Sequence, residues 1–267
     1  MKNKNLLTAS VVLLITGGIL ILSSCSKQEG PAGPQGPAGP AYNSGSIFGF
    51  VSLYDQYGVK QATPLKGIKV TIDGTTAVSL TDSTGKYMFS NLSSGTYNLS
   101  IADTVNASYA PSKVKSINLV LGPSQHDIHL GQIPTFTLLS PTTVDSLEKN
   151  KLDTVNVVRI HGTVNIDTKA REFLVFVGAD SSVSSAPANY FSVYAAAIAA
   201  NQTVFSTTIA LTDLMSAGFT HGSTVYFMTY PAGVNYASAS EYEDLNTGRI
   251  MYNEVGPLPV WSKFVIP

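Results

Sequence analysis

The sequence contains very little cysteine and little charge. Cys25 is the single cysteine among 267 residues, which excludes a disulfide framework or a cysteine-based metal site within one chain. Charged side chains make up 12% of the residues, and the formal net charge is −1. A nucleic-acid-binding protein normally carries a basic stripe. Because none is visible in the sequence, we expect no nucleic-acid partner.

The chain is also poor in the residues that build long surface helices. Ser, Thr, Asn and Gly are plentiful, and the chain has 13 tyrosines. This composition favours short strands and tight turns. The length of 267 residues allows two ordinary domains, which can be stabilised by apolar burial without disulfides. We therefore predict an all-β protein with two tandem β-sandwich domains.

Residues 1–24 have the three parts of a secretory signal peptide. Lys2 and Lys4 provide the positive start, and an apolar run follows from Leu6 to Leu22. The sequence Leu22-Ser23-Ser24-Cys25 then resembles a bacterial lipobox. The resemblance implies cleavage between Ser24 and Cys25 and acylation of the cysteine sulfur. A retained transmembrane anchor with an incidental cysteine is the alternative.

Two or more acyl chains anchor a protein stably, so the lipobox implies a membrane partner reached through lipid. Ser26 stands where many inner-membrane lipoproteins carry a retaining aspartate. The expected location is therefore the outer membrane, on its periplasmic or cell-surface face.

Residues 25–45 read as a linker after the lipidated cysteine. Residues 30–41 consist of Gly-Pro triplets of the collagen type. A polyproline II rod of this length spans roughly 37 Å, at about 3.1 Å per residue. We interpret the segment as a stiff spacer, and a trimerising stalk is the alternative.

Alternating apolar residues begin at Ser46. The segment 46–131 shows the period-2 pattern of half-buried strands, first at Ile47, Gly49, Val51 and Leu53. The pattern recurs in three further places: Ile68, Val70 and Ile72; Tyr97, Leu99 and Ile101; and Ile117, Leu119, Leu121, Ile128 and Leu130. The segment 81–87 is expected to form a turn between two of these strands. The Asp82 carboxylate is suited to capping this turn, and Gly85 is suited to a positive φ angle.

Four stretches of this segment occur in an order typical of one family. They are Gly49-Phe50-Val51, Pro64-Leu65-Lys66-Gly67-Ile68-Lys69-Val70, Thr81-Asp82 with Gly85-Lys86-Tyr87-Met88-Phe89, and Leu92 with Gly95-Thr96-Tyr97. Together they resemble the carboxypeptidase regulatory-like domain, a transthyretin-like β-sandwich grouped with carbohydrate-binding-like folds. The resemblance implies a noncatalytic module of the kind common in surface proteins.

The segment 132–267 is also expected to form a β-sandwich. The candidate strands are 155–166, 173–178, 191–196, 204–211, 225–230, 249–253 and 263–266. Leu211-Thr212-Asp213-Leu214, followed by Tyr226, resembles the corner of a fibronectin type III domain, where a leucine and a later tyrosine brace two strands. The spacing is stretched here, and another immunoglobulin-like sandwich is the alternative.

Catalytic and metal-binding motifs are missing from the sequence, so we expect no catalytic residue, metal or cofactor. The histidines are His126, His129, His161 and His221, and the close pair should point to opposite faces of a strand. A predicted loop before Arg249 contains four residues with oxygen ligands: Glu241, Glu243, Asp244 and Asn246. They are candidates for a calcium site, although a solvated acidic loop is the simpler interpretation.

Aromatic side chains are candidates for an exposed sugar-stacking platform, with core packing as the competing role. The candidates are Tyr54, Tyr57, Tyr109, Tyr190, Tyr236, Tyr242 and Trp261. The sequence assigns no ligand-binding residue among them.

Four Asp-(Ser/Thr)-X motifs resemble a short O-glycosylation signal used on exported proteins of one Gram-negative phylum. The resemblance implies modification of Ser83, Thr104, Ser146 and Thr154. The same dipeptides also form simple turns, and this alternative stays open.

Three functions follow from these patterns. The first is a noncatalytic, membrane-anchored binding module of the cell envelope whose partner is a glycan or an envelope protein. The second is a structural component of a surface complex or fimbria. The third, a hydrolase, is suggested only by the association of regulatory-like domains with peptidases.

Overall fold

The computed structural model describes residues 44–62, 65–105, 107–139, 143–149, 156–234, 242–244 and 247–267. The expected signal peptide, the Ser24–Cys25 cleavage site, nearly all of the linker and Thr154 lie outside these residues. The described part is almost entirely β, which confirms the predicted fold class. None of its helices is long and apolar enough to cross a membrane.

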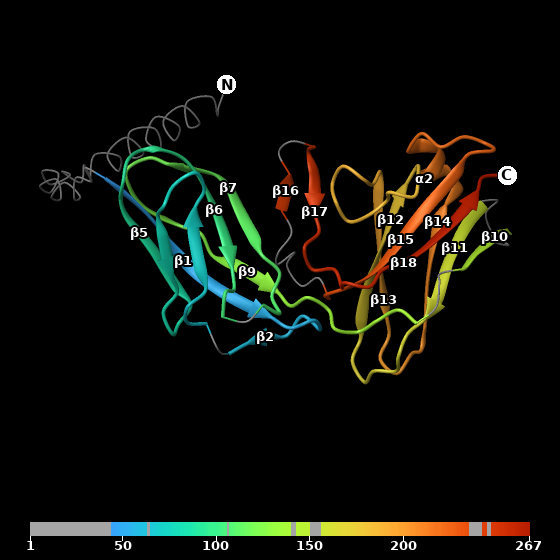
Figure 1. Ribbon diagram of the computed structural model, residues 1–267, viewed down its shortest axis with the longest axis horizontal. Coiled ribbons are helices and arrows are strands. Elements are labelled where there is room, and N and C mark those ends of the chain that lie inside the picture. The colour runs from blue at the N-terminus through green and yellow to red at the C-terminus, as the bar shows by residue number, and fades with distance from the viewer. Residues whose placement is uncertain are drawn as a thin grey trace, which may run out of the picture. The chain divides into compact units, whose positions relative to one another are not determined.

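The first group of strands forms two sheets that share one core (Figure 1). Its members are β1 (Gly45–Tyr54), β2 (Lys60–Gln61), β3 (Lys69–Ile72), β4 (Val78–Leu80), β5 (Lys86–Leu92), β6 (Gly95–Ala102), β7 (Ser112–Leu119), β8 (Gly122–Gln125) and β9 (Ile128–Gly131). One sheet is built around β1, and the other has the antiparallel order β4-β3-β6-β7.

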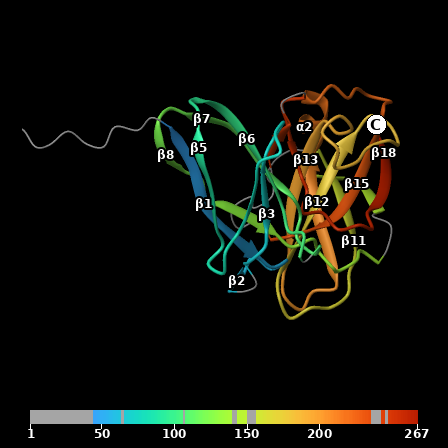
Figure 2. The same ribbon diagram turned by 60° about the vertical axis from the view of Figure 1, so that its left-hand side comes forward.

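Strand β1 holds its sheet together because it pairs with four strands. Its first half lies between antiparallel β5 and parallel β8, and its second half pairs with antiparallel β2 and parallel β9. Figure 2 shows β5 and β8 beside the first half and β2 at the far end. Ile47, Val51 and Leu53 on this strand are buried, as the alternation predicts.

The turn before β5 has the predicted chemistry. The Asp82 carboxylate accepts hydrogen bonds from the backbone N–H groups of Thr84 (2.8 Å) and Lys86 (3.0 Å). Gly85 has φ = +83°, a conformation that favours glycine. The prediction was wrong at Leu121, because β7 ends at Leu119 and the Leu121 side chain lies in the following turn, 52% exposed.

The second group of strands forms two sheets, β10-β11-β14 and β13-β12-β15-β18, and the hairpin β16-β17. Its elements are β10 (Thr143–Lys149), β11 (Asn156–Thr163), β12 (Arg171–Gly178), β13 (Ser192–Ile198), β14 (Val204–Ala210), α2 (Leu211–Ser216), β15 (Thr224–Ala232), β16 (Tyr242–Asp244), β17 (Arg249–Met251) and β18 (Val260–Val265). The main core between the sheets includes Phe173, Phe205 and Phe227.

Strand β12 is buried on both faces, which explains its unbroken apolar sequence. Phe173, Val175 and Val177 point into the main core. Leu174 and Phe176 point to the opposite face and join a second apolar cluster there. A sheet face that would otherwise meet water is therefore partly covered by protein.

The expected fibronectin-type corner is not formed. Leu214 lies on the short helix α2, is fully buried and belongs to the main core. Tyr226 lies on β15 and packs against the second cluster, on the other face of the sheet. The two side chains are separated by the sheet, so the tyrosine does not brace the leucine.

Candidate ligand-binding surface

An aromatic surface lies on the outer face of the sheet β13-β12-β15-β18. Tyr226 and Met228 project from β15 on this face, because Val225 and Phe227 fill the main core. Met228 is the direct cross-strand neighbour of Trp261 on β18, and Tyr226 is the neighbour of Lys263. Cross-strand neighbours project on the same face of a sheet, so Trp261 and Lys263 extend the surface to the sheet edge.

A surface pocket of about 230 Å³ opens beside Trp261. It is lined by Ser181, Val183, Tyr226, Phe227, Met228, Trp261 and Ser262. The Trp261 side chain is 60% exposed, although tryptophan is one of the most costly side chains to leave in water. Exposed apolar surface at a pocket typically marks a contact site.

The loop that carries Ser181 and Val183 packs closely against β12. Val183 is only 3% exposed, and a Cβ atom at Gly178 would lie 2.7 Å from the Val183 Cβ, so glycine permits this close packing. The Asp180 carboxylate accepts hydrogen bonds from the Ser182 hydroxyl and from its backbone N–H. These bonds lower the pKa of Asp180 and fix the loop that carries Ser181 and Val183.

The floor next to the pocket is a packed group of aromatic rings. The Phe176 ring contacts the rings of Tyr190, Tyr230 and Tyr252 edge to face, with centroid distances of 5.3, 5.4 and 5.4 Å. The Tyr190 hydroxyl donates a 2.6 Å hydrogen bond to the Ile250 carbonyl. Edge-to-face packing and a satisfied hydroxyl restrict these side chains, so the binding surface is largely formed before any ligand arrives.

The pocket is chemically suited to a ligand with one apolar face and a polar edge. Trp261, Met228 and Val183 supply apolar side chains, and Ser181 and Tyr226, which carry hydroxyl groups, line the same pocket. Among the described residues that line it, none carries a carboxylate, imidazole, thiol or ammonium group. The lining therefore favours contacts through apolar surface and hydrogen bonds, and none of these described side chains is ordinarily ionised at neutral pH.

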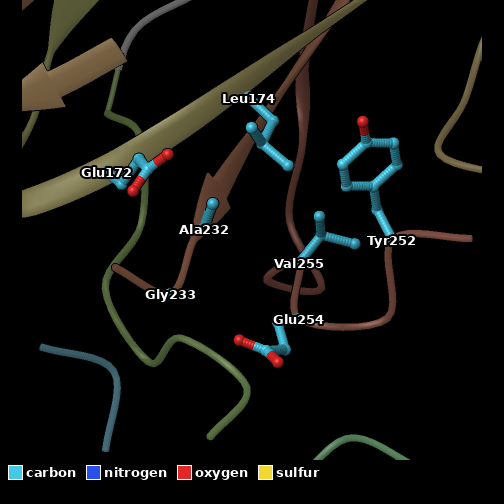
Figure 3. A pocket seen from close by; sticks show the side chains of 7 residues that line it. All are labelled: Glu172, Leu174, Ala232, Gly233, Tyr252, Glu254 and Val255. Atoms are coloured by element: carbon cyan, nitrogen blue, oxygen red, sulfur yellow. The ribbon is translucent and has the colours of Figure 1, made fainter. Parts of the chain in front are cut away.

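A second, smaller pocket lies where the segment after β17 meets β12 and β15 (Figure 3). Its volume is about 20 Å³, which is enough for a single water molecule. Figure 3 shows the carboxylates of Glu172 and Glu254 among its lining, with Leu174, Tyr252 and Val255 on the apolar side. The space is too small for an organic ligand.

The predicted histidines do not meet in one site. His126 Nε2 lies 2.9 Å from the Ser124 hydroxyl, whereas the His129 ring packs against Tyr54 at 5.2 Å. His221 contacts the Pro267 carbonyl, and His161 lies on β11. Across the described residues, no group of three or more His, Cys, Asp or Glu side chains is placed to hold a metal ion.

The acidic segment before Arg249 is not the predicted loop. Glu243 and Asp244 belong to strand β16, which pairs with β17 in a hairpin. The Asp244 carboxylate accepts a 2.9 Å hydrogen bond from the Thr247 hydroxyl and so closes the hairpin turn. Glu241 and Asn246 lie outside the described residues.

The structure separates the aromatic candidates. Trp261 is exposed at the pocket, whereas Tyr190 is buried in the second cluster. Tyr54, Tyr57 and Tyr109 are half-buried elsewhere, Tyr236 lies outside the described residues, and only the backbone of Tyr242 is described. Tyr226, Met228 and Val183 line the pocket but were not among the binding candidates predicted from the sequence. A usable signal was the apolar character of both faces of β12, which requires a cover over the outer face.

Two of the predicted modification sites are accessible. Ser83 and Thr104 are exposed, each just after an aspartate whose carboxylate accepts the backbone N–H two residues further on. This turn directs the intervening hydroxyl outward. Ser146 lies on β10, where only the backbone is described, and Thr154 lies outside the described residues.

No protein-family model and no curated protein matches this sequence. Among solved structures, the chain is similar to a "putative carbohydrate binding protein" from Bacteroides uniformis, with 19% identity, 83% of this chain and 99% of that chain covered, and a TM-score of 0.30. The chain is also similar to a DUF3823 family protein from the same species. The identity is 12%, the match covers 84% of this chain and 100% of that chain, and the TM-score is 0.29. A third similar structure is the major pilin SpaD from Corynebacterium diphtheriae. The identity is 12%, the match covers 82% of this chain and 64% of that chain, and the TM-score is 0.23.

Proposed function

We propose that this chain is a noncatalytic binding module for carbohydrate and that the sugar stacks on Trp261. The observation that carries the proposal is the 60% exposure of this indole beside a pocket whose lining also includes hydroxyl-bearing residues. A pyranose ring has the matching surface, because its C–H groups form an apolar face and its hydroxyls lie around the edge.

The expected strength of the interaction is modest. The face of an indole ring is electrostatically negative, so it attracts the partly positive C–H groups of a sugar. A contact between two aromatic rings contributes about 1 kcal/mol beyond burial of area, and we take the contact between a sugar and an indole to be of similar size. A single sugar should therefore bind weakly, at about millimolar concentration, and a polymer with several copies of the epitope should bind more tightly.

A hydrolase is disfavoured by the chemistry of the pocket. Glycoside hydrolysis generally needs two carboxyl groups about 5 to 9.5 Å apart on either side of the scissile bond. The lining of the Trp261 pocket, as far as the structure describes it, supplies none. Turnover of peptide, ester or glycoside substrates by the purified chain would contradict the noncatalytic assignment.

Affinity electrophoresis in gels that contain polysaccharide, guided by a glycan array, tests the proposal. Trp261→Ala should abolish retention in the gel. Leu258→Ala is the matched control, because Leu258 has the same 60% exposure but does not line the pocket. Equal retention of Trp261→Ala and the unmodified chain would overturn the proposal, and so would the absence of any retained glycan.

An assembly role is the second candidate, and the edge strand β18 favours it. Strand β18 pairs only with β15 among the described strands, and its Trp261 and Val265 side chains are exposed. Unpaired strand edges can accept a strand from another chain. A monomeric mass at all concentrations in light scattering, with no partner in crosslinked cells, would exclude this role.

We further propose that Cys25 is lipidated and tethers the chain to the outer membrane, facing the periplasm or the cell surface. The lipobox and the Gly-Pro linker of the sequence support this proposal. Native protein should incorporate labelled palmitate, and Cys25→Ala should move it from the membrane to the soluble fraction. Unchanged fractionation of the variant would contradict the tether.

We also propose a division into domains and a covalent modification of the mature chain. Residues 46–131 and 132–267 are proposed as separate domains, which is supported by their distinct apolar cores. Each segment expressed alone should then unfold cooperatively.

O-glycosylation of Ser83 and Thr104 is supported by the exposure of both side chains, and an intact mass without hexose additions on native protein would rule it out.

A further inference from the structure

A third pocket has a different chemical character from the Trp261 pocket. Its volume is about 280 Å³, and it lies on the outer face of the sheet β4-β3-β6-β7. It is lined by Lys69, Thr71, Ser100, Ile101, Ala102, Thr104, Pro111, Ser112, Lys113 and Asn253. The lining combines two ammonium groups with several hydroxyls, and none of these described residues is acidic.

The strand register explains why these groups converge. Thr71, Ser100 and Lys113 are cross-strand neighbours on β3, β6 and β7, so they form one row across the sheet. Lys69 lies opposite Ala102 in the adjacent row. The small side chain of Ala102, the last residue of β6, leaves room at this end of the sheet face, and Lys69 borders it.

The far wall of this pocket is fixed by a hydrogen bond. The Asn253 side-chain amide donates a 2.9 Å hydrogen bond to the Pro111 carbonyl, which holds the segment after β17 against the beginning of β7. The pocket is thereby enclosed by chain segments far apart in sequence. A solvated lysine pair on an open strand would lack this wall.

The two lysines differ in their surroundings. The Lys113 ammonium lies 3.7 Å from the Asp73 carboxylate, which also accepts a 2.5 Å hydrogen bond from the Ser100 hydroxyl. Lys69 has no ion-pair partner among the residues that the structure describes. Its charge is therefore available to an anion, whereas the charge of Lys113 is partly neutralised by Asp73.

We propose that this pocket binds a sugar acid, that is, a hydroxylated ring that carries one carboxylate. The carboxylate pairs with Lys69, the ring lies over Ala102, and the ring hydroxyls bond to the row formed by Thr71, Ser100 and Lys113. The site lies on a different sheet from Trp261 and shares no residue with its pocket. It is therefore a second site, independent of the sugar binding proposed at Trp261, and it requires Thr104 to be unmodified.

Amide-resolved NMR titration of the full mature chain with sodium glucuronate tests the site. Glucose, acetate and inorganic phosphate at the same ionic strength separate the contributions of ring and charge. Glucuronate should shift the resonances of residues 69–71, 100–104 and 111–113, and acetate, phosphate and glucose should bind at least tenfold more weakly. Phosphate or acetate binding as tightly as glucuronate would overturn the assignment to a sugar acid.

Two variants distinguish the contribution of the Lys69 charge to binding from the contribution of the shape of the pocket. Lys69→Met removes the free ammonium and should weaken glucuronate binding at least tenfold, whereas Lys86→Met, an exposed lysine on β5 of the other sheet, should leave it unchanged. Ala102→Leu keeps both charges but fills the room beside Lys69, and it should also abolish binding. Unfolding midpoints confirm that each variant is folded.

The possible results are distinct from those of the Trp261 experiment. Loss of binding in Lys69→Met but not in Ala102→Leu would indicate simple ion pairing at the surface and overturn the pocket. Trp261→Ala should leave glucuronate binding at this site unaltered. A parallel loss in Trp261→Ala would show that the ligand occupies the other pocket, and it would also overturn the inference.

Discussion

The Tyr57 hydroxyl donates a 2.8 Å hydrogen bond to the carboxylate of Asp167, 110 residues further along the chain. The Lys169 ammonium lies 4.4 Å from the centroid of the same tyrosine ring. Next to it, the Gln56 side chain accepts a 2.8 Å hydrogen bond from the Thr135 backbone N–H. The turn after β1 is thus bonded directly to residues that follow the first group of strands.

Removal of this hydroxyl should loosen the connection without disturbing either core. We expect Tyr57→Phe to lower the unfolding midpoint by about 2 °C, the effect of one partly exposed hydrogen bond in a chain of this size. Differential scanning calorimetry measures the shift, and Tyr97→Phe, whose hydroxyl bonds only to the nearby Ser93 carbonyl, is the control. A larger shift in the control would contradict the role of Tyr57.

Stability should fall in acid because three turn carboxylates have a lowered pKa. The Thr84 hydroxyl lowers the pKa of Asp82, the Lys169 backbone N–H that of Asp167, and the Ser182 hydroxyl that of Asp180. A carboxylate with a pKa lowered by folding stabilises the fold above its unfolded pKa of about 3.9. That contribution is lost as the pH falls through the folded pKa.

The midpoint of thermal unfolding should therefore stay level from neutral pH to about pH 5 and decrease between about pH 5 and pH 2. Asp82→Asn should make the acid decrease shallower, because the asparagine does not titrate. The same dependence in this variant and in the unmodified chain would show that Asp82 does not contribute.

Arg171 is a buried cation whose guanidinium is hydrogen-bonded to backbone carbonyls. Its side chain is 1% exposed, and its guanidinium donates hydrogen bonds to the carbonyls of Asn165 (2.6 Å) and Gln202 (3.1 Å). Arg171→Met should destabilise the chain by about 2 kcal/mol, because both carbonyls lose a charged donor. Arg171→Lys should recover only part of this loss, since an ammonium cannot reproduce the planar fork. Urea unfolding curves measure the free energy of unfolding of both variants. If Arg171→Lys were as stable as the unmodified chain, the planar guanidinium would not be required at this position.

Gly49 permits the closest backbone approach in the first sheet. A Cβ atom at this position would lie 1.9 Å from the His126 carbonyl oxygen, so Gly49→Ala must push β1 away from the segment between β8 and β9. We expect a loss of about 3 kcal/mol. Gly95→Ala, on the exposed start of β6 with its nearest atom at 3.8 Å, should change the free energy of unfolding by less than about 1 kcal/mol. Equal effects at both glycines would contradict the steric explanation.

Local patterns predicted the fold well wherever a strand has one buried face. The alternation at Ile68, Val70 and Ile72 corresponds to β3, and the Asp82–Gly85 turn forms as its side-chain chemistry requires. The alternation and the turn both depend on residues close in sequence. Local sequence is therefore sufficient information for them.

Trp261 was one of seven aromatic candidates in the sequence, but its selection and the other residues of the pocket depend on pairing between distant strands. The exposure of Trp261 results from its place opposite Met228 on an edge strand, and Tyr190 is buried by a ring cluster from several strands. Strand β16 escaped prediction because its acidic sequence favours a loop and only the pairing with β17 makes it a strand. The same cause separates Leu214 from Tyr226.

Intrinsic fluorescence tests the central claim most directly, because Trp261 is the only tryptophan in the chain. Addition of a glycan that is retained in the affinity gel should shift the emission of this half-exposed indole to shorter wavelength and protect it from quenching by acrylamide. A retained glycan that leaves both emission and quenching unchanged would contradict the account, because the sugar would then bind without covering the indole.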